Sequence, residues 1–556
     1  MIGVISSDKD RKVVREFFEL FKTPWEFYDP HRSYDVVLST QNKIQKTNSK
    51  LLIIYSSDKS HFDDIREIRV QSAYRNASVE YHRTEIPIYG NLLTFEGIGR
   101  PILYVKDNSE VAGLEIKSEG LRKIVLGYNL FEEIDHLLST GQPKENAHIP
   151  TLEIHISIVR SLITDAGILL IEVPPVPAGY DFITCLTHDI DFWGIRNHIL
   201  DDSMWGFLYR ASVGSMLGVF GRRLSFQKLL KNWKAVLSLP LVYLGLTKDF
   251  WLQVNTYAEI EKDLKSTFFL IPFKNRTGNK MPHVTTKRRS TKYDISDVRE
   301  TVKELTEQGF EIGLHGIDAW HSLEKARQEF DRVLEYCNGP EIGVRIHWLF
   351  FNHDSYRTLE SAGFSYDSTF GYNEAVGYRA GTGQVFKPFT IKKLLELPLH
   401  IQDTALFYPR RMNLSEEKAL HLCENLLKNA NSYGGILTIL WHDRSLSPER
   451  LWGDFYIKLL EEIKKYNIWF ATAGQAVRWF RKRRALVFDQ VKDMGDRIRL
   501  ELKNDENYHE SEVDPPLLLR IYPPRIQGPG NGDLALYRRN YSDIPWRGEK
   551  EMEIPL

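Results

Sequence analysis

The sequence predicts an α/β protein built around a parallel (β/α) barrel of about seven or eight strands. Between residues 266 and 473, short apolar runs rich in β-branched and aromatic residues alternate with amphipathic helical segments. Several of these helical segments end at a glycine, which is a common helix stop. Because repeated strand–helix units with apolar strands form parallel sheets covered by helices, this number of units favours closure into an irregular barrel.

Residues 1–150 are predicted to form a separate N-terminal α/β domain. No glycine-rich phosphate loop follows any of its apolar runs, so nucleotide binding is not indicated. We interpret this domain as a scaffold or a substrate-adjacent domain. Strands are expected at 1–5, 34–39, 51–55, 85–90, 92–95, 102–105 and 123–127, and a helix is expected at 13–21.

The barrel region is predicted to span residues 151–482. A helix at 152–166 and the proline cluster at 174–177 lead into the first barrel strand at 181. Further barrel strands are expected at 266–273, 311–315, 343–351, 394–400, 435–442 and 468–473.

A helical, aromatic insertion at about 192–264 interrupts this barrel. A basic amphipathic helix can lie on a membrane surface, although it more often covers a core. Peripheral membrane contact through 204–246 therefore stays open, as does a role as a lid or wall for a long substrate. Basic residues separate its apolar pieces, namely Arg222, Arg223, Lys228, Lys231 and Lys234.

Residues 483–556 are predicted to form a small antiparallel β module. The run at 497–502 alternates apolar and polar residues, and the run at 517–522 is apolar. Pro- and Gly-rich turns at 523–524 and 528–532 follow. The tail from Tyr537 is expected to be poorly ordered.

Composition excludes several classes of protein. The formal net charge of −1 argues against a nucleic-acid partner held by bulk charge. The three cysteines, Cys185, Cys337 and Cys423, are far apart in the chain, which indicates reduced thiols in a cytosolic protein. Neither a secretory signal nor an uncharged apolar run of about 20 residues is found. We expect a cytoplasmic protein, with membrane association left open and no oligomeric state indicated.

The segment Cys185-Leu-Thr-His-Asp-Ile-Asp191 organises the predicted site. Asp189 and Asp191 end the first barrel strand, and side chains two residues apart on a strand point to the same side. Two carboxylates aimed at one point repel each other unless a positive charge lies between them, and a divalent metal would supply it. The competing interpretation is a turn that caps a following helix.

Other polar residues stand where the predicted strands end, which is the catalytic face of a parallel barrel. A carboxylate with two imidazoles and an open position is the ligand set of a catalytic zinc-type site. The candidate residues at these strand ends are His315, His321, Arg345, His347, Asp403 and His442.

Several blocks between about 181 and 480 resemble the polysaccharide deacetylases, the NodB-homology group of carbohydrate esterases (family 4-like). The resemblance implies a NodB-like barrel that removes an acetyl group from an N-acetylated sugar with one divalent metal, zinc being the expected ion. The blocks are Leu186-Thr-His-Asp-Ile-Asp, Ser266-Thr-Phe-Phe, Glu311-Ile-Gly-Leu-His-Gly, Val344-Arg-Ile-His-Trp-Leu, Tyr378-Arg-Ala-Gly-Thr, Leu395-Glu-Leu-Pro-Leu and Trp441-His.

The resemblance also implies a role for each matching residue. Asp189 corresponds to the general base and Asp191 to a metal ligand. His315 corresponds to the first histidine ligand. Arg345 corresponds to the arginine that orients the base, and His442 to the general acid. Asp403 matches the aspartate that tunes this last histidine.

Two departures from the family pattern leave alternatives open. The second histidine ligand usually lies four residues after the first, where this chain has Ala319. We take His347 as that ligand and keep His321 in reserve. Gly383-Gln-Val also replaces a stretch expected to contact substrate. The competing hypotheses are a barrel that binds carbohydrate without cleaving it, and a membrane-associated factor in glycan assembly.

Overall fold

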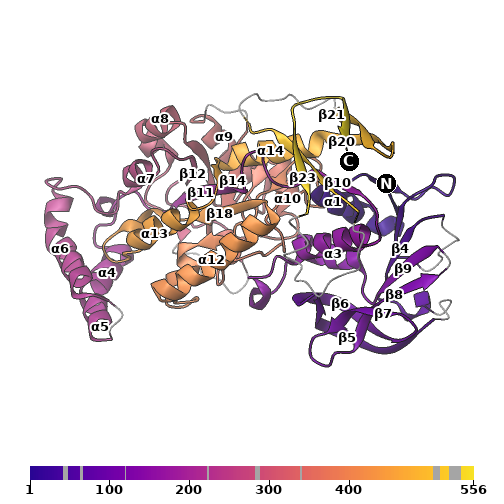
Figure 1. Ribbon diagram of the computed structural model, residues 1–556. Coiled ribbons are helices and arrows are strands. Elements are labelled where there is room, and N and C mark those ends of the chain that lie inside the picture. Colours follow the sequence, from indigo (N-terminus) through magenta and orange to yellow (C-terminus); the bar gives the residue numbers. More distant parts are fainter. Residues whose placement is uncertain are drawn as a thin grey trace.

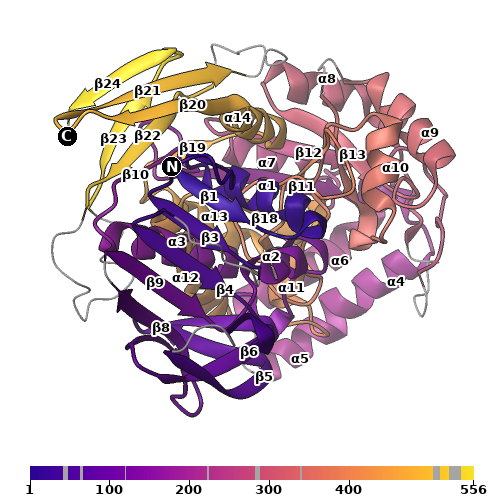
Figure 2. The ribbon, with the colours of Figure 1, turned by 90° about the vertical axis from the view of Figure 1, so that its right-hand side faces the viewer.

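The centre of the computed structural model is a curled parallel sheet that carries helices on its outer face (Figures 1 and 2). Its strands follow the order β16-β15-β14-β13-β12-β11-β18-β17, and β19 also pairs with β11. The structure describes residues 1–41, 48–62, 67–118, 120–221, 224–281, 289–337, 341–504, 514–524 and 540–555. The strands are β11 (Phe182–Ile190), β12 (Ser266–Leu270), β13 (Glu311–Gly316), β14 (Gly343–Ile346), β15 (Tyr366–Asp367), β16 (Leu395–Glu396), β17 (Ile401–Gln402), β18 (Ile436–Leu440) and β19 (Ile468–Phe470).

This sheet confirms the α/β class but takes the form of an open half-barrel. The strand path ends at β16 on one side and at β17 on the other. The sequence predicts one continuous strand at 394–400, whereas the structure has two short strands separated by a segment that contains Pro398. Proline cannot donate to a sheet, so the pairing stops there and resumes on the opposite edge.

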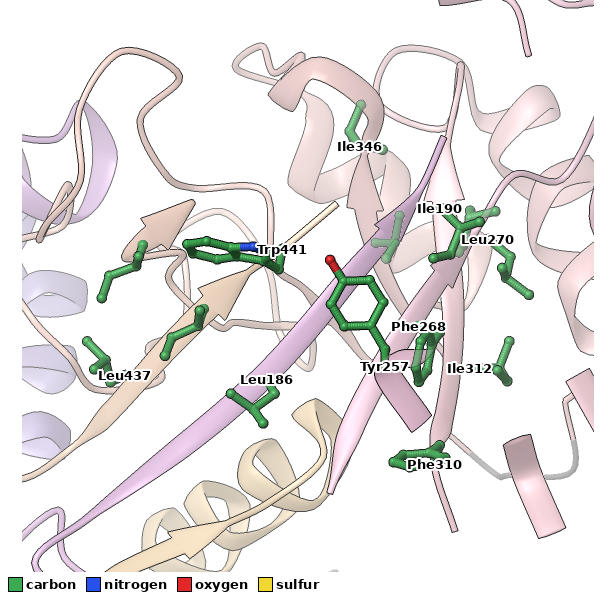
Figure 3. Close-up of a cluster of buried hydrophobic side chains, with 14 of the residues drawn as sticks. Leu186, Ile190, Tyr257, Phe268, Leu270, Phe310, Ile312, Ile346, Leu437 and Trp441 are labelled. Carbon is green, nitrogen blue, oxygen red and sulfur yellow. The ribbon is translucent and has the colours of Figure 1, made fainter. Parts of the chain in front are cut away.

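Strand β11 is buried over its whole length. Successive side chains of a strand point to opposite faces of the sheet, so β11 contributes one set of residues to the core and another to the site. Leu186, His188 and Ile190 belong to one side, and Leu186 and Ile190 pack there among Tyr257, Phe268 and Trp441 in the main core (Figure 3). Thr187 and Asp189 point to the other side, into the curl of the sheet. The helices that cover the sheet are α7 (Val254–Ile260), α8 (Arg299–Glu307), α9 (Leu323–Leu334), α10 (Ser355–Ala362), α12 (Glu416–Tyr433), α13 (Gly453–Ile463) and α14 (Ala473–Ala485).

The N-terminal part forms a second sheet, in the order β2-β1-β3-β4-β9-β8-β7-β5-β6. Helix α3 (Thr151–Asp165) follows residue 150, yet it is buried in the same cluster as α1 and these strands, so the division at 150 remains a prediction. The elements are β1 (Ile2–Ile5), α1 (Arg11–Phe21), β2 (Trp25–Phe27), β3 (Val36–Ser39), β4 (Leu51–Tyr55), β5 (Ile68–Tyr81), β6 (Thr84–Gly97), β7 (Arg100–Val105), β8 (Val111–Ser118), β9 (Leu121–Leu126) and α2 (Leu130–Ser139).

The C-terminal part forms two antiparallel sheets, β20-β21-β24 and β10-β22-β23, the second of which includes β10 from the segment before β11. The expectation of a poorly ordered tail is wrong for β23 and β24, because both pair with a neighbouring strand. The turn predicted at 528–532 lies outside the described residues. The strands are β10 (Leu170–Glu172), β20 (Leu486–Asp493), β21 (Arg497–Asn504), β22 (Leu517–Tyr522), β23 (Ser542–Trp546) and β24 (Glu551–Pro555).

The insertion after β11 forms a helical pair that projects from the end of the molecule opposite the N-terminal sheet (Figure 1). It consists of α4 (Asp202–Tyr209), a π-helix (Arg210–Gly214), α5 (Ser215–Phe220) and α6 (Phe226–Tyr243). A small core of its own, which includes Phe207, Leu239 and Trp251, holds the pair together. Within the described residues, none of the helices combines the length and the hydropathy that a membrane span requires.

Candidate active site

Three residues from neighbouring strand ends converge at the carboxyl edge of the half-barrel. Asp191 follows β11, His315 lies near the end of β13, and His347 follows β14. The Nε2 atoms of His315 and His347 lie 3.3 and 3.2 Å from Asp191 Oδ1. One ligand atom from each of the three residues falls within 4.8 Å of the others. The register pairs His315 with Arg345 across β13 and β14, so His347 lies two residues farther along, just past the end of β14.

The chemistry of this cluster fits a bound cation. His315 Nδ1 lies 3.0 Å from the Arg345 carbonyl oxygen, which can only accept, so Nδ1 carries the hydrogen and Nε2 of a neutral ring offers its lone pair. Asp191 Oδ1 is buried and has no hydrogen-bond partner among the described residues. Burial alone would raise the pKa of Asp191, but His347 and His315 hold it below its usual range. Three electron-pair donors facing one point are stable only around a positive charge.

Asp189 lies beside this cluster and is held by an arginine. Arg345 Nη1 donates to Asp189 Oδ1 at 3.1 Å and to Thr187 Oγ1 at 2.8 Å. The guanidinium is itself fixed by the Ser368 carbonyl oxygen at 3.0 Å and the Ser368 hydroxyl at 2.9 Å. His315 Nε2 is 3.8 Å from the second oxygen, Asp189 Oδ2. Arg345 therefore fixes one carboxylate oxygen and leaves the other directed toward the cluster.

His442 forms a second functional pair, with Asp403. His442 Nδ1 lies 2.6 Å from Asp403 Oδ1, and the His442 backbone N–H donates to Asp403 Oδ2 at 2.7 Å. The Ser445 hydroxyl also donates to Asp403. Burial opposes a charged imidazole, yet the charge of Asp403 and its hydrogen bond raise the pKa of His442 to about 9. A histidine in this state is a proton donor at neutral pH.

The structure keeps His321 out of the cluster. Its Nε2 lies 3.2 Å from Asp318 Oδ1, and its Nδ1 is 3.4 Å from the amide nitrogen of Asn279. His347 comes into position because the chain turns sharply after it, with positive φ angles of 66° at Trp348 and 54° at Leu349. Such angles are unfavourable for residues other than glycine and are sometimes held in place at functional sites.

Arg289 is a supporting residue that sequence reasoning missed. Its side chain is fully buried, and Nη2 donates to the carbonyl oxygens of Ile317 at 2.9 Å and His347 at 3.0 Å. The guanidinium also lies 4.2 Å from the Phe350 ring centroid. Arg289 thus braces the strained turn that carries His347. No local pattern in the sequence marks this arginine, because its partners come from two other strand ends.

His188 is structural despite its place in the motif. It faces the core side of β11, where Nε2 lies 3.0 Å from Glu261 Oε1 and Nδ1 lies 2.9 Å from the Trp441 carbonyl oxygen. The Tyr456 hydroxyl donates to the same Glu261 carboxylate. The alternation of β11 therefore assigns His188 to the core and its two neighbouring carboxylates to the site.

We expect Glu261→Ala to destabilise the protein by about 3 kcal/mol, because it leaves His188 and the Tyr456 hydroxyl buried without their shared partner. Equilibrium urea unfolding would measure the change. Glu259→Ala, at an exposed position in α7 two residues before Glu261, serves as the control and should cost less than about 0.5 kcal/mol. A similar small cost for Glu261→Ala would contradict the structural role given to His188.

These groups line one cavity of about 450 Å³. Asp191, His315, His347 and the Asp189 carboxylate lie on its wall together with His442, so the two functional pairs share a single solvent space. The wall also holds residues that sequence reasoning did not identify, namely Trp348, Tyr408, Arg411, Asp443, Arg444 and Arg450.

The altered stretch Gly383-Gln-Val lies away from this cavity. The Gln384 amide donates to both carboxylate oxygens of Glu153 in α3, at 3.3 and 3.2 Å, and the Thr382 hydroxyl binds Glu153 as well. Gln384 Oε1 accepts from Arg483 at 3.1 Å. The stretch thus connects the half-barrel to α3 and α14, and it is not among the residues that line the cavity.

Comparisons with known proteins add solved structures at low similarity. No protein-family model and no curated protein matches the sequence. An inferred polysaccharide deacetylase from Mycobacterium smegmatis is 18% identical, with a TM-score of 0.34, and the match covers 56% of this chain and 95% of that one. The PuuE allantoinase is 13% identical, with a TM-score of 0.33, and the match covers 55% of this chain and 92% of that one. The Xyl-CE4 domain of a multidomain xylanase from the hindgut metagenome of Trinervitermes trinervoides is 14% identical, with a TM-score of 0.24. The match covers 42% of this chain and 85% of that one. At these TM-scores the likeness carries no functional argument, which has to come from the site itself.

Proposed function

We propose that this protein is a metal-dependent hydrolase that removes an acetyl group from an N-acetylated sugar of a glycan or glycan precursor. The observation that carries the proposal is the arrangement of three functional units around one cavity. These units are the Asp191–His315–His347 cluster, the Asp189–Arg345 pair and the His442–Asp403 pair. The motifs that resemble polysaccharide deacetylases contain all of these residues except Asp403, which follows the block at 395–399.

Asp191, His315 and His347 would hold the metal, for which zinc is the candidate because two imidazoles and a carboxylate suit it. When bound, a divalent cation polarises the substrate carbonyl and makes water more acidic. Within the cavity, Asp189 is the group able to take a proton from an attacking water, since Arg345 holds one of its oxygens and the other stays available. His442, which carries a proton at neutral pH, gives it to the leaving amine nitrogen.

The test is acetate release from an N-acetylchitooligosaccharide, measured together with the metal content of the purified protein. Release of acetate that stops after chelation and returns with added zinc would support the proposal. A protein that binds zinc and the oligosaccharide but releases no acetate would favour the carbohydrate-binding alternative.

The pH dependence of turnover tests the role of His442. Because His442 must be protonated to act as an acid, kcat should fall as the pH rises through its pKa of about 9. Asp403→Asn removes the charge that raises this pKa, so the fall should move to lower pH, and kcat at pH 8 should drop about tenfold or more. A pH profile of acetate release measures this.

The control for this prediction breaks a different aspartate–histidine pair. Asp318→Asn disrupts the contact with His321 outside the cavity. The fall of kcat at high pH should then stay at the same pH as in the wild type. If the fall of kcat at high pH does not move in Asp403→Asn, the assignment of His442 as the acid is refuted.

A further inference from the structure

A second groove borders the active-site cavity beneath the projecting helices. This groove, of about 480 Å³, shares Tyr408, Arg450 and Trp452 with the cavity wall. Its opposite wall comes from the insertion, where Gly214, Ser215 and Gly218 present little side-chain bulk. A long molecule seated in the cavity would therefore extend along the insertion.

Positive charge is concentrated where the two spaces meet. Arg444 Nη2 lies 2.7 Å from Glu449 Oε1, and Arg210 Nη2 lies 3.8 Å from the same oxygen. In the described chain, Arg450 forms no ion pair with a carboxylate and rests over the rings of Tyr408 and Trp452, at 5.0 Å from each. Two arginines thus share the Glu449 carboxylate and the third has no ion-pair partner in the described chain, which leaves a surplus of positive charge among these residues.

The arginines are built into the protein and still have free donors. Arg444 is only 8% exposed and lies 3.9 Å from the Trp251 ring centroid and 4.5 Å from that of Phe192. The Nε atoms of Arg444 and Arg210 are buried and have no hydrogen-bond partner within the described ranges. Arg210 begins the π-helix, a distortion that often marks functional sites. Buried guanidinium donors without partners are suited to an anionic group such as a phosphate.

The outer face of the insertion is apolar and exposed. On α6 the exposed residues recur at intervals of three or four, which places them along one side of the helix. The segment from α4 to α5 carries a second such stripe, and Phe220 and Leu237 are each 79% exposed. The α6 stripe is Phe226, Leu230, Trp233, Leu237 and Leu241, and the α4–α5 stripe is Trp205, Tyr209, Val213, Met216 and Phe220.

The composition of this face favours a membrane surface over a protein partner. Helix α6 contains Lys228, Lys231 and Lys234 and no acidic residue. Lysines beside a stripe of Trp, Phe and Leu are the pattern of helices that lie in the interface of an anionic bilayer. The helices that carry this face also supply Arg210, Gly214 and Ser215 to the wall of the groove, which links the insertion to the active site.

We propose that the substrate is an N-acylated sugar joined through a phosphate or diphosphate to a lipid, and that the helical pair α4–α6 seats on the membrane that holds it. This inference rests on the proposed function, because it names the substrate class of the same site. The sugar occupies the cavity, the phosphate lies at Arg210, Arg444 and Arg450, and the lipid chain leaves through the groove.

The first test is sedimentation of the full chain with vesicles of equal parts phosphatidylcholine and phosphatidylglycerol. The wild type should sediment with the vesicles. The vesicle partition coefficient of the double variant Phe220→Glu/Leu237→Glu should be at least about tenfold lower. Ile98→Glu, at a residue 81% exposed on the N-terminal sheet, should behave as the wild type. Equal partitioning of the double variant, or a wild type that self-associates without binding vesicles, would overturn the membrane role.

The second test uses calorimetric titration with farnesyl diphosphate, farnesol and uridine diphosphate. Farnesyl diphosphate should bind about tenfold tighter than the other two, since only it offers both an anion and an apolar chain. Arg450→Gln, with Arg210→Gln as a second variant, should weaken that binding about tenfold and leave vesicle sedimentation unchanged. Uridine diphosphate binding as tightly would overturn the lipid carrier, and unchanged binding in both variants would overturn the arginine site.

Both tests are also run on Asp191→Asn, because they measure binding and do not require turnover. Vesicle and diphosphate binding by the wild type without acetate release from any substrate would refute the proposed function and leave a membrane-bound site for a lipid phosphate. Acetate release from soluble oligosaccharides without either kind of binding would refute the inference alone.

Discussion

His347→Ala is expected to remove the metal and reduce acetate release by about 10³-fold or more, because several kcal/mol of transition-state stabilisation depends on the bound cation. The imidazole contributes one of three donors that converge on a point beside Asp191 Oδ1, and alanine leaves only two. Metal content by mass spectrometry and initial rates of acetate release would measure the two effects. Thermal unfolding would check that the variant is folded.

The matched control is a substitution of His321, which the sequence offers as the alternative second histidine ligand. His321→Ala should retain the metal and most of the activity, since its ring is bound to Asp318 and lies outside the cluster. Loss of metal in His321→Ala together with its retention in His347→Ala would reverse the assignment of the ligands.

Asp189→Asn is expected to keep the metal and lose turnover by about 10²- to 10⁴-fold, because an amide cannot take the proton from the attacking water. The change preserves shape, and Arg345 still has the Thr187 and Ser368 oxygens as partners. Single-turnover rates and metal content, measured on the same preparation, would show whether turnover is lost while the metal is retained.

Asp191→Asn provides the opposite pattern, two residues along the chain. It should lose the metal, and its activity should return in part at high zinc concentration, whereas added zinc should not rescue Asp189→Asn. Full activity of Asp189→Asn would reject this residue as the base.

Part of the site follows directly from local sequence rules. The two-residue spacing of Asp189 and Asp191 predicts a shared side, and in the structure both carboxylates lie on the wall of one cavity. The apolar runs around His315, Arg345 and His442 likewise predict strands, and these strands run parallel. In a parallel sheet, residues at strand ends must meet at one edge, so the candidates could be gathered without any knowledge of distances.

Other features could not be predicted because they depend on contacts between distant segments. The choice between His321 and His347 is decided by a strained turn that Arg289 supports from another loop. The interruption of the strand at 394–400 depends on where Pro398 falls relative to two different sheet edges. Likewise, the contact of Gln384 with Glu153 joins segments more than two hundred residues apart.

By itself, the sequence determined the α/β class, the order of the strands along the chain and the chemical types of residue at their ends, because these depend on periodicity over a few residues. Only the tertiary structure decided that the sheet stays open, that His347 rather than His321 joins Asp191 and His315, and that Arg210 and Arg450 line one groove beneath the helical insertion. The physical reason is that charge pairing, burial and shared cavities are properties of side chains brought together by folding, and sequence separation gives no measure of that distance.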